Sequence, residues 1–272
     1  MQVIDSIARF RKALDNERMH GRSVGLVPTM GALHEGHASL IDSAMRRCDV
    51  VAVTVFVNPL QFGAGEDLSR YPRPFESDLA LASGQGASYV FAPSVDEMYP
   101  GGVRTTVHVD ELADVMEAAT RPGHFDGVAT VVAKVFNAAG PTIAFFGEKD
   151  WQQLQVIRRM TVDLSFPVEV VACPTVRADD GLALSSRNAY LDGPERAAAA
   201  VLYRGLCAAA ALASSGERQL ARLRDTVAST VAAEPLVQLE YAEALRRHDE
   251  IRLLVAARVG PARLIDNLGV PL

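Results

Sequence analysis

Apolar residues follow two different spacings along roughly the first 173 residues of the chain. Uninterrupted apolar runs are typical of strands buried on both faces of a parallel sheet, and they lie at 24–28, 50–57, 89–91, 142–146 and 168–172. Between the runs, apolar residues recur at helical spacing, and the predicted helices cover about 36–47, 75–83, 110–119, 126–138 and 151–163. This alternation predicts an α/β domain with right-handed crossovers.

The N-terminus also shows helical spacing. Its apolar residues are Val3, Ile4, Ile7, Phe10 and Leu14. With Asp5 as a cap, this pattern predicts a helix at the very start of the chain.

The pattern changes near Pro174. A polar loop at 177–188 leads into predicted helices at about 194–214 and 217–233, strands at 239–245 and 252–258, and the segment RLID at 263–266. These elements predict a smaller α+β domain. The expected domains are 1–173 and 174–272.

Composition excludes several classes of protein. The 272 residues are 49% hydrophobic and 22% charged, with a net charge of −6, which is not the balance of a general nucleic-acid binder. Cys48, Cys173 and Cys207 are scattered, which argues against disulfides and a structural zinc site. No secretory signal and no apolar run of membrane-spanning length is evident, so we expect a soluble, cytoplasmic protein that binds neither membrane nor nucleic acid.

The segment His34-Glu35-Gly36-His37 carries the most chemical information. It follows the strand at 24–28 and opens the next helix, so two imidazoles lie at a helix start, where free N–H groups favour phosphate. Imidazole donors there suit a reaction at phosphorus, because charge builds on the phosphate oxygens. The alternative is a pair of surface histidines on an ordinary helix.

A second strand-to-helix junction holds Gly147-Glu148-Lys149-Asp150. Lys149 is a cation where the helix dipole opposes it, and a phosphate in front of the helix would reverse the sign of that effect. A structural alternative is a capping pair between Asp150 and Gln153. We expect a phosphate role for Lys149.

Further polar residues are candidates with weaker signals. Ser185, Ser186 and Arg187 end a polar loop and suit a polyphosphate, although a solvated inter-domain loop is the alternative. Gln61 and Gln153 suit a ligand with hydroxyl groups, because an amide both donates and accepts, but either could be an ordinary polar residue. Arg121 could meet a carboxylate, and an exposed structural arginine is an equal alternative. No P-loop, dinucleotide-binding glycine motif or nucleophile elbow occurs.

Together these segments resemble the bacterial pantothenate synthetase (pantoate–β-alanine ligase) family. The matching segments are PTMGALHEGH at 28–37, FVNPLQF at 56–62, RPGHFDGV at 121–128, FFGEKDWQQL at 145–154, DGLALSSRN at 180–188 and RLIDN at 263–267. The resemblance implies a Rossmann-like nucleotidylyltransferase domain with a parallel sheet, a C-terminal lid domain and a homodimer. It also implies Mg²⁺ bound with ATP, which is a substrate, and no tightly bound organic cofactor.

The implied reaction has two steps. The carboxylate of pantoate attacks the α-phosphorus of ATP to give pantoyl adenylate and pyrophosphate, and the amine of β-alanine then attacks the acyl carbon to give pantothenate and AMP. The resemblance implies that His37 is the catalytic proton donor. The chemistry of the residues adds catalytic roles for His34 and Lys149, which with His37 and Mg²⁺ can neutralise the charge that grows on the phosphates.

Binding roles also follow from the matching positions. Gln61 and Gln153 would hold pantoate, and Gln61 would also lie near β-alanine. The implied ATP-binding residues are Met30, Gly31, Ala32, Leu33, His34, Glu35, Gly36, His37, Gly147, Glu148, Lys149, Asp150, Val176, Leu184, Ser185, Ser186 and Arg187. The chain departs from the family at Ser77, where an acidic residue is expected, at Thr120 and at Trp151.

Two rival functions remain at this point. A nucleotidyltransferase that makes a stable dinucleotide or coenzyme precursor uses the same HxGH machinery but would lack the two glutamines. A non-catalytic nucleotide-binding regulator would have a broken HxGH or no lysine, and both features are intact here.

Overall fold

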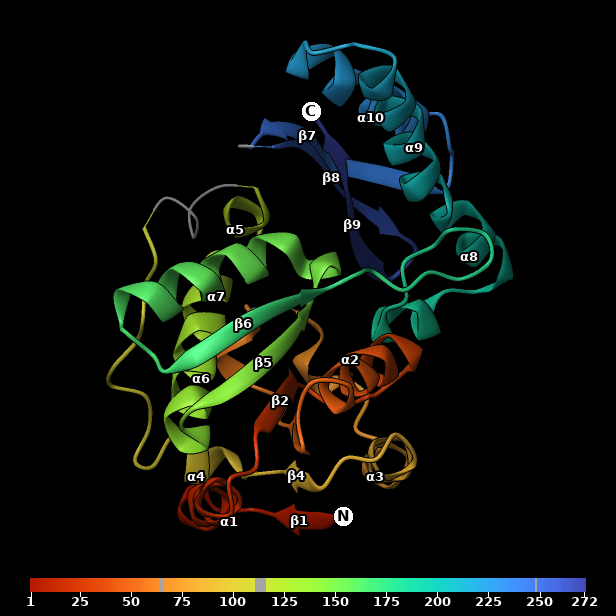
Figure 1. The fold of residues 1–272 in the computed structure, drawn as a ribbon. Coiled ribbons are helices and arrows are strands. Elements are labelled where there is room, and N and C mark those ends of the chain that lie inside the picture. Colours follow the sequence, from red (N-terminus) through yellow and green to blue (C-terminus); the bar gives the residue numbers. More distant parts are fainter. Residues whose placement is uncertain (64–65, 111–115, 248) are drawn as a thin grey trace. The chain divides into compact units, whose positions relative to one another are not determined.

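The computed structural model describes residues 1–63, 66–110, 116–247 and 249–272. These residues form two compact units, drawn as a ribbon in Figure 1. The first consists of Met1–Gly147 and Trp151–Pro174, and the second of Glu148–Asp150 and Thr175–Leu272.

A six-stranded sheet forms the centre of the first unit. Every neighbouring pair of strands in it is parallel, which confirms the predicted α/β class. The strands lie in the order β1 (Gln2–Ile4), β4 (Tyr89–Phe91), β3 (Val50–Val55), β2 (Val24–Thr29), β5 (Thr142–Gly147) and β6 (Val168–Cys173).

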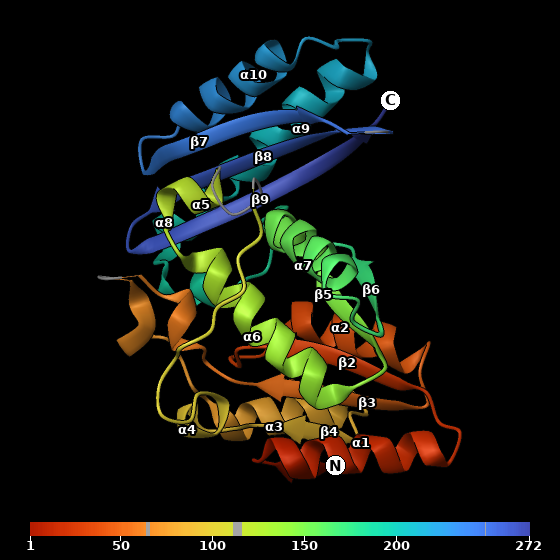
Figure 2. The ribbon, with the colours of Figure 1, turned by 90° about the vertical axis from the view of Figure 1, so that its left-hand side faces the viewer.

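Helices cover both faces of this sheet. The helices of the first unit are α1 (Ile7–Met19), α2 (Glu35–Met45), α3 (Phe75–Gly84), α4 (Val95–Met98), α5 (Glu117–Thr120), α6 (His124–Ala139) and α7 (Trp151–Asp163). One buried cluster joins α1, α6 and α7 to the sheet through residues such as Phe10, Phe136 and Ile157. Another joins α2 and α3 to the sheet through Ile41, Ala44 and Ala82. Figure 2 shows α6 and α7 in front of the strands.

The predicted N-terminal helix is wrong in its first turn. Residues 2–4 form β1, which pairs with β4 at the edge of the sheet, and α1 begins only at Ile7. Its cap is Ser6, whose Oγ accepts from the Arg9 N–H, rather than Asp5. Sheet pairing with a strand nearly 90 residues away overrides the local helical spacing, because an edge strand gains backbone hydrogen bonds and a buried Ile4 (1% exposed).

The helix predicted over 110–119 falls partly on residues 111–115, which lie outside the described residues. Within the described part of that range, α5 starts only at Glu117 and ends at Thr120. The remaining predicted strands and helices of this unit are present, and their bounds differ from the predicted ones by at most two residues.

The second unit packs helices on a three-stranded antiparallel sheet. Strands β7 (Val237–Arg246), β8 (Glu250–Val259) and β9 (Ala262–Pro271) lie in chain order. The single helix predicted at 194–214 is two helices, α8 (Gly193–Ala199) and α9 (Val201–Ser214), and α10 (Leu220–Ala232) follows. Buried side chains of α9 and α10, among them Leu206 and Val227, pack against those of β8 such as Val255. The RLID segment lies in β9.

Among the described residues, one apolar stretch has the length and composition of a membrane span, which the sequence analysis did not identify. It covers Gly193–Ser214, and half of its most apolar part is buried inside the protein. Its apolar residues form the core of the second unit, which is how a core helix passes the same test.

Candidate active site

The two histidines of the HEGH segment build the start of α2. His34 is the N-cap, and its Nδ1 accepts a hydrogen bond from the Gly36 N–H at 3.1 Å. His37 lies three residues on, and its Nδ1 accepts from the His34 N–H at 3.3 Å. The ring centroids are 4.2 Å apart. The pair thus forms a reciprocal capping box made of two imidazoles.

These bonds assign the protons of both rings. An imidazole nitrogen that accepts a hydrogen bond carries no proton, so each ring is neutral with its proton on Nε2. An imidazolium has two donors and no acceptor, so protonation of either ring would break the capping bond that its Nδ1 accepts. Each ring therefore offers an Nε2–H donor at a helix N-terminus, which is the arrangement needed to stabilise negative charge on a phosphate.

The loop before the histidines has a left-handed backbone. Gly31 has φ +86° and Ala32 has φ +50°, a conformation that costs a residue with a Cβ of order 1 kcal/mol. The Thr29 hydroxyl accepts from the Gly31 N–H at 3.1 Å and donates to the Thr54 carbonyl on β3. The ends of β2 and β3 therefore hold the loop in place.

Asp78 completes the support of this loop. Its carboxylate, on the first turn of α3, accepts from the Ala32 N–H at 3.0 Å and from the Leu33 N–H at 2.7 Å. Burial raises the pKa of this carboxyl, and the two N–H groups oppose that rise. Asp78 is 1% exposed, whereas Ser77 is exposed. The loop is thus supported by Asp78 and not by residue 77.

Gln61 lies at the end of η1 (Pro59–Gln61), a 3₁₀ turn that follows β3, and it is 7% exposed. Its Oε1 accepts from the Asn58 amide at 3.0 Å, and the same amide donates to the Gly127 carbonyl. The Tyr99 hydroxyl donates to Asn58 Oδ1 at 2.8 Å. This chain of bonds fixes which way the amide of Gln61 points, and its Nε2 remains the donor end.

Arg121, predicted as a possible carboxylate ligand, binds a carboxylate of the protein itself. Its guanidinium makes a bidentate pair with Glu66, at 2.8 and 2.7 Å, and donates to the Gln61 carbonyl at 3.1 Å. Burial raises the pKa of Glu66, but the hydrogen bonds and charge of Arg121 outweigh it and leave that pKa below its usual value. Within the described residues, Arg121 serves to hold the backbone of Gln61.

His124 adds a second support to the same carbonyl. Its Nδ1 lies 2.8 Å from the Gln61 carbonyl, and its Nε2 lies 2.9 Å from the Arg121 guanidinium, which can only donate. The proton therefore sits on Nδ1. Burial and the charge of Arg121 lower the pKa of His124 to about 4.

Gly127 allows α6 to approach η1, which we call the glutamine turn because it ends at Gln61. A Cβ built at this position would lie 2.2 Å from the Leu60 carbonyl oxygen and 2.8 Å from the Gln61 nitrogen. No other residue fits there without moving the turn. The candidate pantoate residue is therefore positioned by a helix–turn contact that only glycine permits.

The lysine turn consists of η3 (Glu148–Asp150) and belongs to the second compact unit. It directly follows β5 and directly precedes α7, which carries the half-buried Gln153. The Lys149 side chain is 19% exposed, and its Nζ lies 3.6 Å from Asp150 Oδ1. A positive charge is thus placed at a helix start, as the sequence predicts.

The other predicted ATP-binding residues of the second unit also lie on one short segment. The Leu184 N–H donates to the Val176 carbonyl at 3.0 Å, which brings these two residues together across a tight loop. Ser185 caps η4 (Ser186–Tyr190), where its Oγ accepts from the Arg187 N–H at 3.3 Å.

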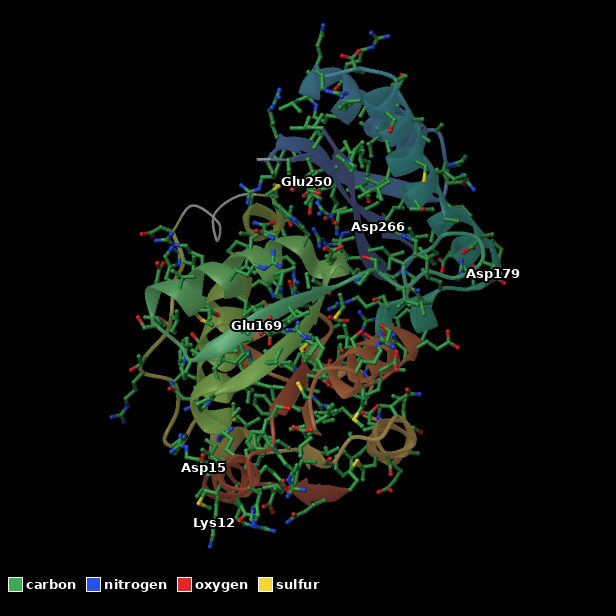
Figure 3. All side chains as sticks on the ribbon, in the orientation of Figure 1. Lys12, Asp15, Glu169, Asp179, Glu250 and Asp266 are labelled. Atoms are coloured by element: carbon green, nitrogen blue, oxygen red, sulfur yellow. The ribbon has the colours of Figure 1, made fainter. Side chains whose placement is uncertain are left out.

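An ion pair anchors this loop to β9. Arg177 makes a bidentate pair with Asp266, at 2.6 and 2.9 Å, and its guanidinium lies 4.0 Å from the centroid of the Tyr203 ring. Asp266, labelled in Figure 3, is 4% exposed. Burial raises its pKa, and Arg177 opposes that rise.

Each unit therefore collects its own share of the predicted site. The first holds residues 30–37, Gln61, Gly147 and Gln153, and the second holds residues 148–150, Val176 and Leu184–Arg187. Sequence reasoning missed Asp78, Asn58, Tyr99 and His124 as supports. Asn58 and His124 lie inside the quoted motifs NPLQF and RPGH, which was the available signal, whereas Asp78 and Tyr99 had none.

Comparison with known proteins gives a consistent result. Residues 2–269 match the family model described as pantoate–β-alanine ligase. The chain is 49% identical to a pantothenate synthetase of Heliobacterium modesticaldum, over 99% of each chain, and 54% identical to one of Rubrobacter xylanophilus, over 93% of each.

Solved structures agree with these sequence relatives. The crystal structure of a pantothenate synthetase from Thermus thermophilus has a TM-score of 0.94, with 47% identity and full coverage of both chains. A pantoate–β-alanine ligase from Francisella tularensis, solved with β-γ ATP and β-alanine, has a TM-score of 0.84 and 34% identity, over 99% of this chain and 97% of that one.

Proposed function

The chain belongs to the pantoate–β-alanine ligase family, and on that premise we propose how its residues divide the work of the reaction. The enzyme condenses (R)-pantoate with β-alanine at the expense of ATP. The reaction is an amide synthesis. The rival functions lose their support, because the glutamine turn and the intact HxGH segment occur together with the family match across the whole chain.

The first step forms pantoyl adenylate. A carboxylate oxygen of pantoate bonds to the α-phosphorus of ATP, the bond from that phosphorus to the bridging oxygen breaks, and pyrophosphate leaves with the electron pair. Negative charge grows on the leaving phosphates. We assign its stabilisation to the Nε2–H donors of His34 and His37 and to the ammonium of Lys149.

His37 is the proposed proton donor. The observation that bears on this assignment is the capping bond from the His34 N–H to His37 Nδ1, which leaves Nε2 as the nitrogen whose proton can be shared with a phosphate oxygen. Before ATP binds, the positive end of the helix dipole disfavours a charged imidazolium at this position. A neutral imidazole avoids that repulsion.

The second step forms the amide. The amine of β-alanine bonds to the acyl carbon, the bond from that carbon to the phosphate oxygen breaks, AMP leaves, and the amine loses a proton. We propose that Gln61 and Gln153 hold pantoate and that Gln61 also lies near β-alanine. The Oε1 of Gln61 already accepts from Asn58, so its Nε2 is the end that would donate to a substrate oxygen.

The remaining ATP-binding residues are proposed from the same motifs, namely residues 30–37, 147–150, Val176 and Leu184–Arg187. We propose residues 1–173 as the domain that binds ATP and pantoate and residues 174–272 as the lid domain. We also propose that the protein is a homodimer and is located in the cytoplasm.

Magnesium enters as part of the MgATP substrate. A Mg²⁺ ion that keeps water and phosphate ligands needs few protein groups.

Isotope exchange between ATP and pyrophosphate tests this function. With pantoate present and β-alanine absent, the enzyme should exchange labelled pyrophosphate into ATP, and omitting pantoate should stop the exchange. Folded protein that consumes ATP only when β-alanine is present, with no exchange before it, would exclude the adenylate route.

A further inference from the structure

Asn267 on β9 contacts the lysine turn from a position 118 residues away in the sequence. Its Nδ2 donates to the carbonyl of Glu148 at 2.8 Å and to the carbonyl of Lys149 at 2.9 Å. The turn and β9 belong to the same compact unit, and Asn267 is 4% exposed. Both protons of one buried amide are therefore used on the two backbone carbonyls that flank the Lys149 α-carbon.

Arg252 on β8 determines the orientation of that amide. Its guanidinium donates to Asn267 Oδ1 at 2.9 Å, and it is held in turn by Glu250, at 2.9 and 3.0 Å. A guanidinium only donates, so Oδ1 must face Arg252 and Nδ2 must face the turn. Figure 3 labels Glu250 at the start of this chain of contacts.

The backbone of β9 leaves room for the Glu250–Arg252 ion pair at Gly269. A Cβ at Gly269, two residues beyond Asn267, would lie 2.3 Å from Glu250 Oε2 and 3.0 Å from an Arg252 nitrogen. The close approach of the Glu250–Arg252 pair to β9 thus depends on a residue without a side chain. Glu250, Arg252 and Asn267 therefore form a connected set of hydrogen bonds that ends at the lysine turn.

The lysine turn has little support of its own. It is a single 3₁₀ turn whose N-cap, Gly147, has no side chain to supply a capping bond. A short turn of this kind needs outside partners to hold one conformation. Asn267 provides them at the two peptide groups that determine where the Lys149 side chain starts.

We propose that Asn267 is a positioning residue for Lys149, oriented by Arg252, and that it sets the direction in which the ammonium meets the phosphates of ATP. The inference rests on the role proposed above for Lys149. Because that ammonium acts on charge that grows as pyrophosphate leaves, its misplacement should reduce the rate of adenylation rather than the binding of pantoate.

Asn267→Asp is the most informative variant. It keeps the size of the side chain and the bond to Arg252, but it turns a carboxylate oxygen toward two carbonyl oxygens and removes both donors. Pantoate-dependent exchange of pyrophosphate into ATP should fall roughly ten- to hundredfold, the range expected when a reacting group is misplaced by about 1 Å, with the KM for pantoate unchanged. Asn267→Ala should also lower the exchange rate.

The control and the double variant separate positioning from folding. Arg258→Ala removes an exposed guanidinium that pairs with Glu240 on the same sheet, and it should leave the exchange rate unchanged because Glu240 keeps its pair with Arg263. Each variant is measured alone and together with Lys149→Ala, and its thermal melting is recorded. If Asn267 acts through Lys149, then Asn267→Asp should add little to the loss already caused by Lys149→Ala, because the two effects are coupled.

The outcomes are distinct. Exchange by Asn267→Asp within about twofold of the parent enzyme, or a loss that multiplies fully with that of Lys149→Ala, overturns the inference and leaves the proposed function standing. Undiminished exchange by Lys149→Ala overturns the inference and the role proposed for Lys149 together.

Discussion

At the scale of single residues, the site relies on side chains that do two things at once. His34 and His37 each use Nδ1 to satisfy a backbone N–H of the helix start and keep the proton on Nε2. Asp78 satisfies two N–H groups of a strained loop, and His124 accepts from one neighbour while donating to another. Substitutions at such positions change both stability and chemistry, so informative variants preserve one of the two.

Variants of His37 can separate its capping bond from its proton. His37→Ala should destabilise the protein by about 0.5–2 kcal/mol through the lost cap, and should slow adenylation by roughly 10²–10⁴-fold through the lost proton donor. His37→Glu can still accept from the His34 N–H, as glutamate does in an ordinary capping box, so it should recover stability. It should remain inactive, because a carboxylate repels phosphate.

Urea unfolding and pyrophosphate exchange, measured on both His37 variants, check this prediction. A His37→Glu enzyme that is stable and turns over at the parent rate would show that residue 37 serves the helix alone.

The half-buried His124 predicts a pH dependence of stability. Its pKa is about 4 in the folded protein, against 6.5 for an unperturbed histidine, so between those values the unfolded chain binds a proton that the folded one does not. The contribution to stability is therefore fully present above pH 6.5 and is lost as the pH falls toward 4, by about 3 kcal/mol in total.

His124→Gln cannot titrate in this range. Its free energy of unfolding should change less between pH 7 and pH 4.5 than that of the parent protein, when both are measured by urea titration. Identical changes in the two proteins would mean that His124 does not carry the effect.

At the scale of elements, the site depends on how closely segments approach each other. The helix α6 touches the glutamine turn η1 at Gly127, and β2 and β3 together hold the loop that leads to the histidines. These contacts between packed elements hold Gln61 and residues 31–34 in defined positions.

Gly127→Ala should disturb this approach. A methyl group 2.2 Å from the Leu60 carbonyl oxygen must push η1 away, since backbone atoms cannot yield as a flexible side chain does. We expect a destabilisation of about 1–3 kcal/mol and a higher KM for pantoate.

Gly84→Ala, at the end of α3, is the matched control. No atom lies within 4 Å of a Cβ built there, and alanine favours helix over glycine by up to about 1 kcal/mol. Thermal melting should therefore show no loss. Equal effects of the two substitutions on melting and on the KM for pantoate would contradict the assigned contact.

At the scale of the whole molecule, the lysine turn is the notable feature. Residues 148–150 interrupt the first unit in the sequence, between β5 and α7, yet they pack within the second. Lys149 therefore shares a compact unit with Ser185, Ser186 and Arg187, three of the other residues proposed to bind ATP.

Chelation distinguishes a metal carried by the substrate from one that is part of the fold. Excess EDTA should abolish pyrophosphate exchange if Mg²⁺ is carried on the phosphates of ATP, as proposed. Thermal melting without ATP should not change, because the proposed ion is carried by the substrate and not by the fold. A lower melting temperature in EDTA, restored by Mg²⁺, would reveal a structural ion instead.

The sequence by itself determined the α/β order of elements, the family and the segments that carry the chemistry. Those properties are local: the spacing of apolar residues reflects burial one element at a time, and motifs such as HEGH and GEKD follow strands whose ends can be read from the chain. The sequence-based prediction of a helix was wrong at residues 2–4, because pairing with a distant strand outweighed the helical spacing of the apolar residues.

Only the tertiary structure decided how the site residues are held. Asp78 lies 45 residues from the Leu33 N–H, and Asn267 lies 118 residues from the Lys149 carbonyl. Arg121 illustrates the same point, because the sequence offered a free cation and the fold supplied Glu66 as its partner. Such partners depend on which elements the packing brings into contact, and a buried polar group then takes whichever neighbour satisfies it. Periodicity along one segment does not carry that information.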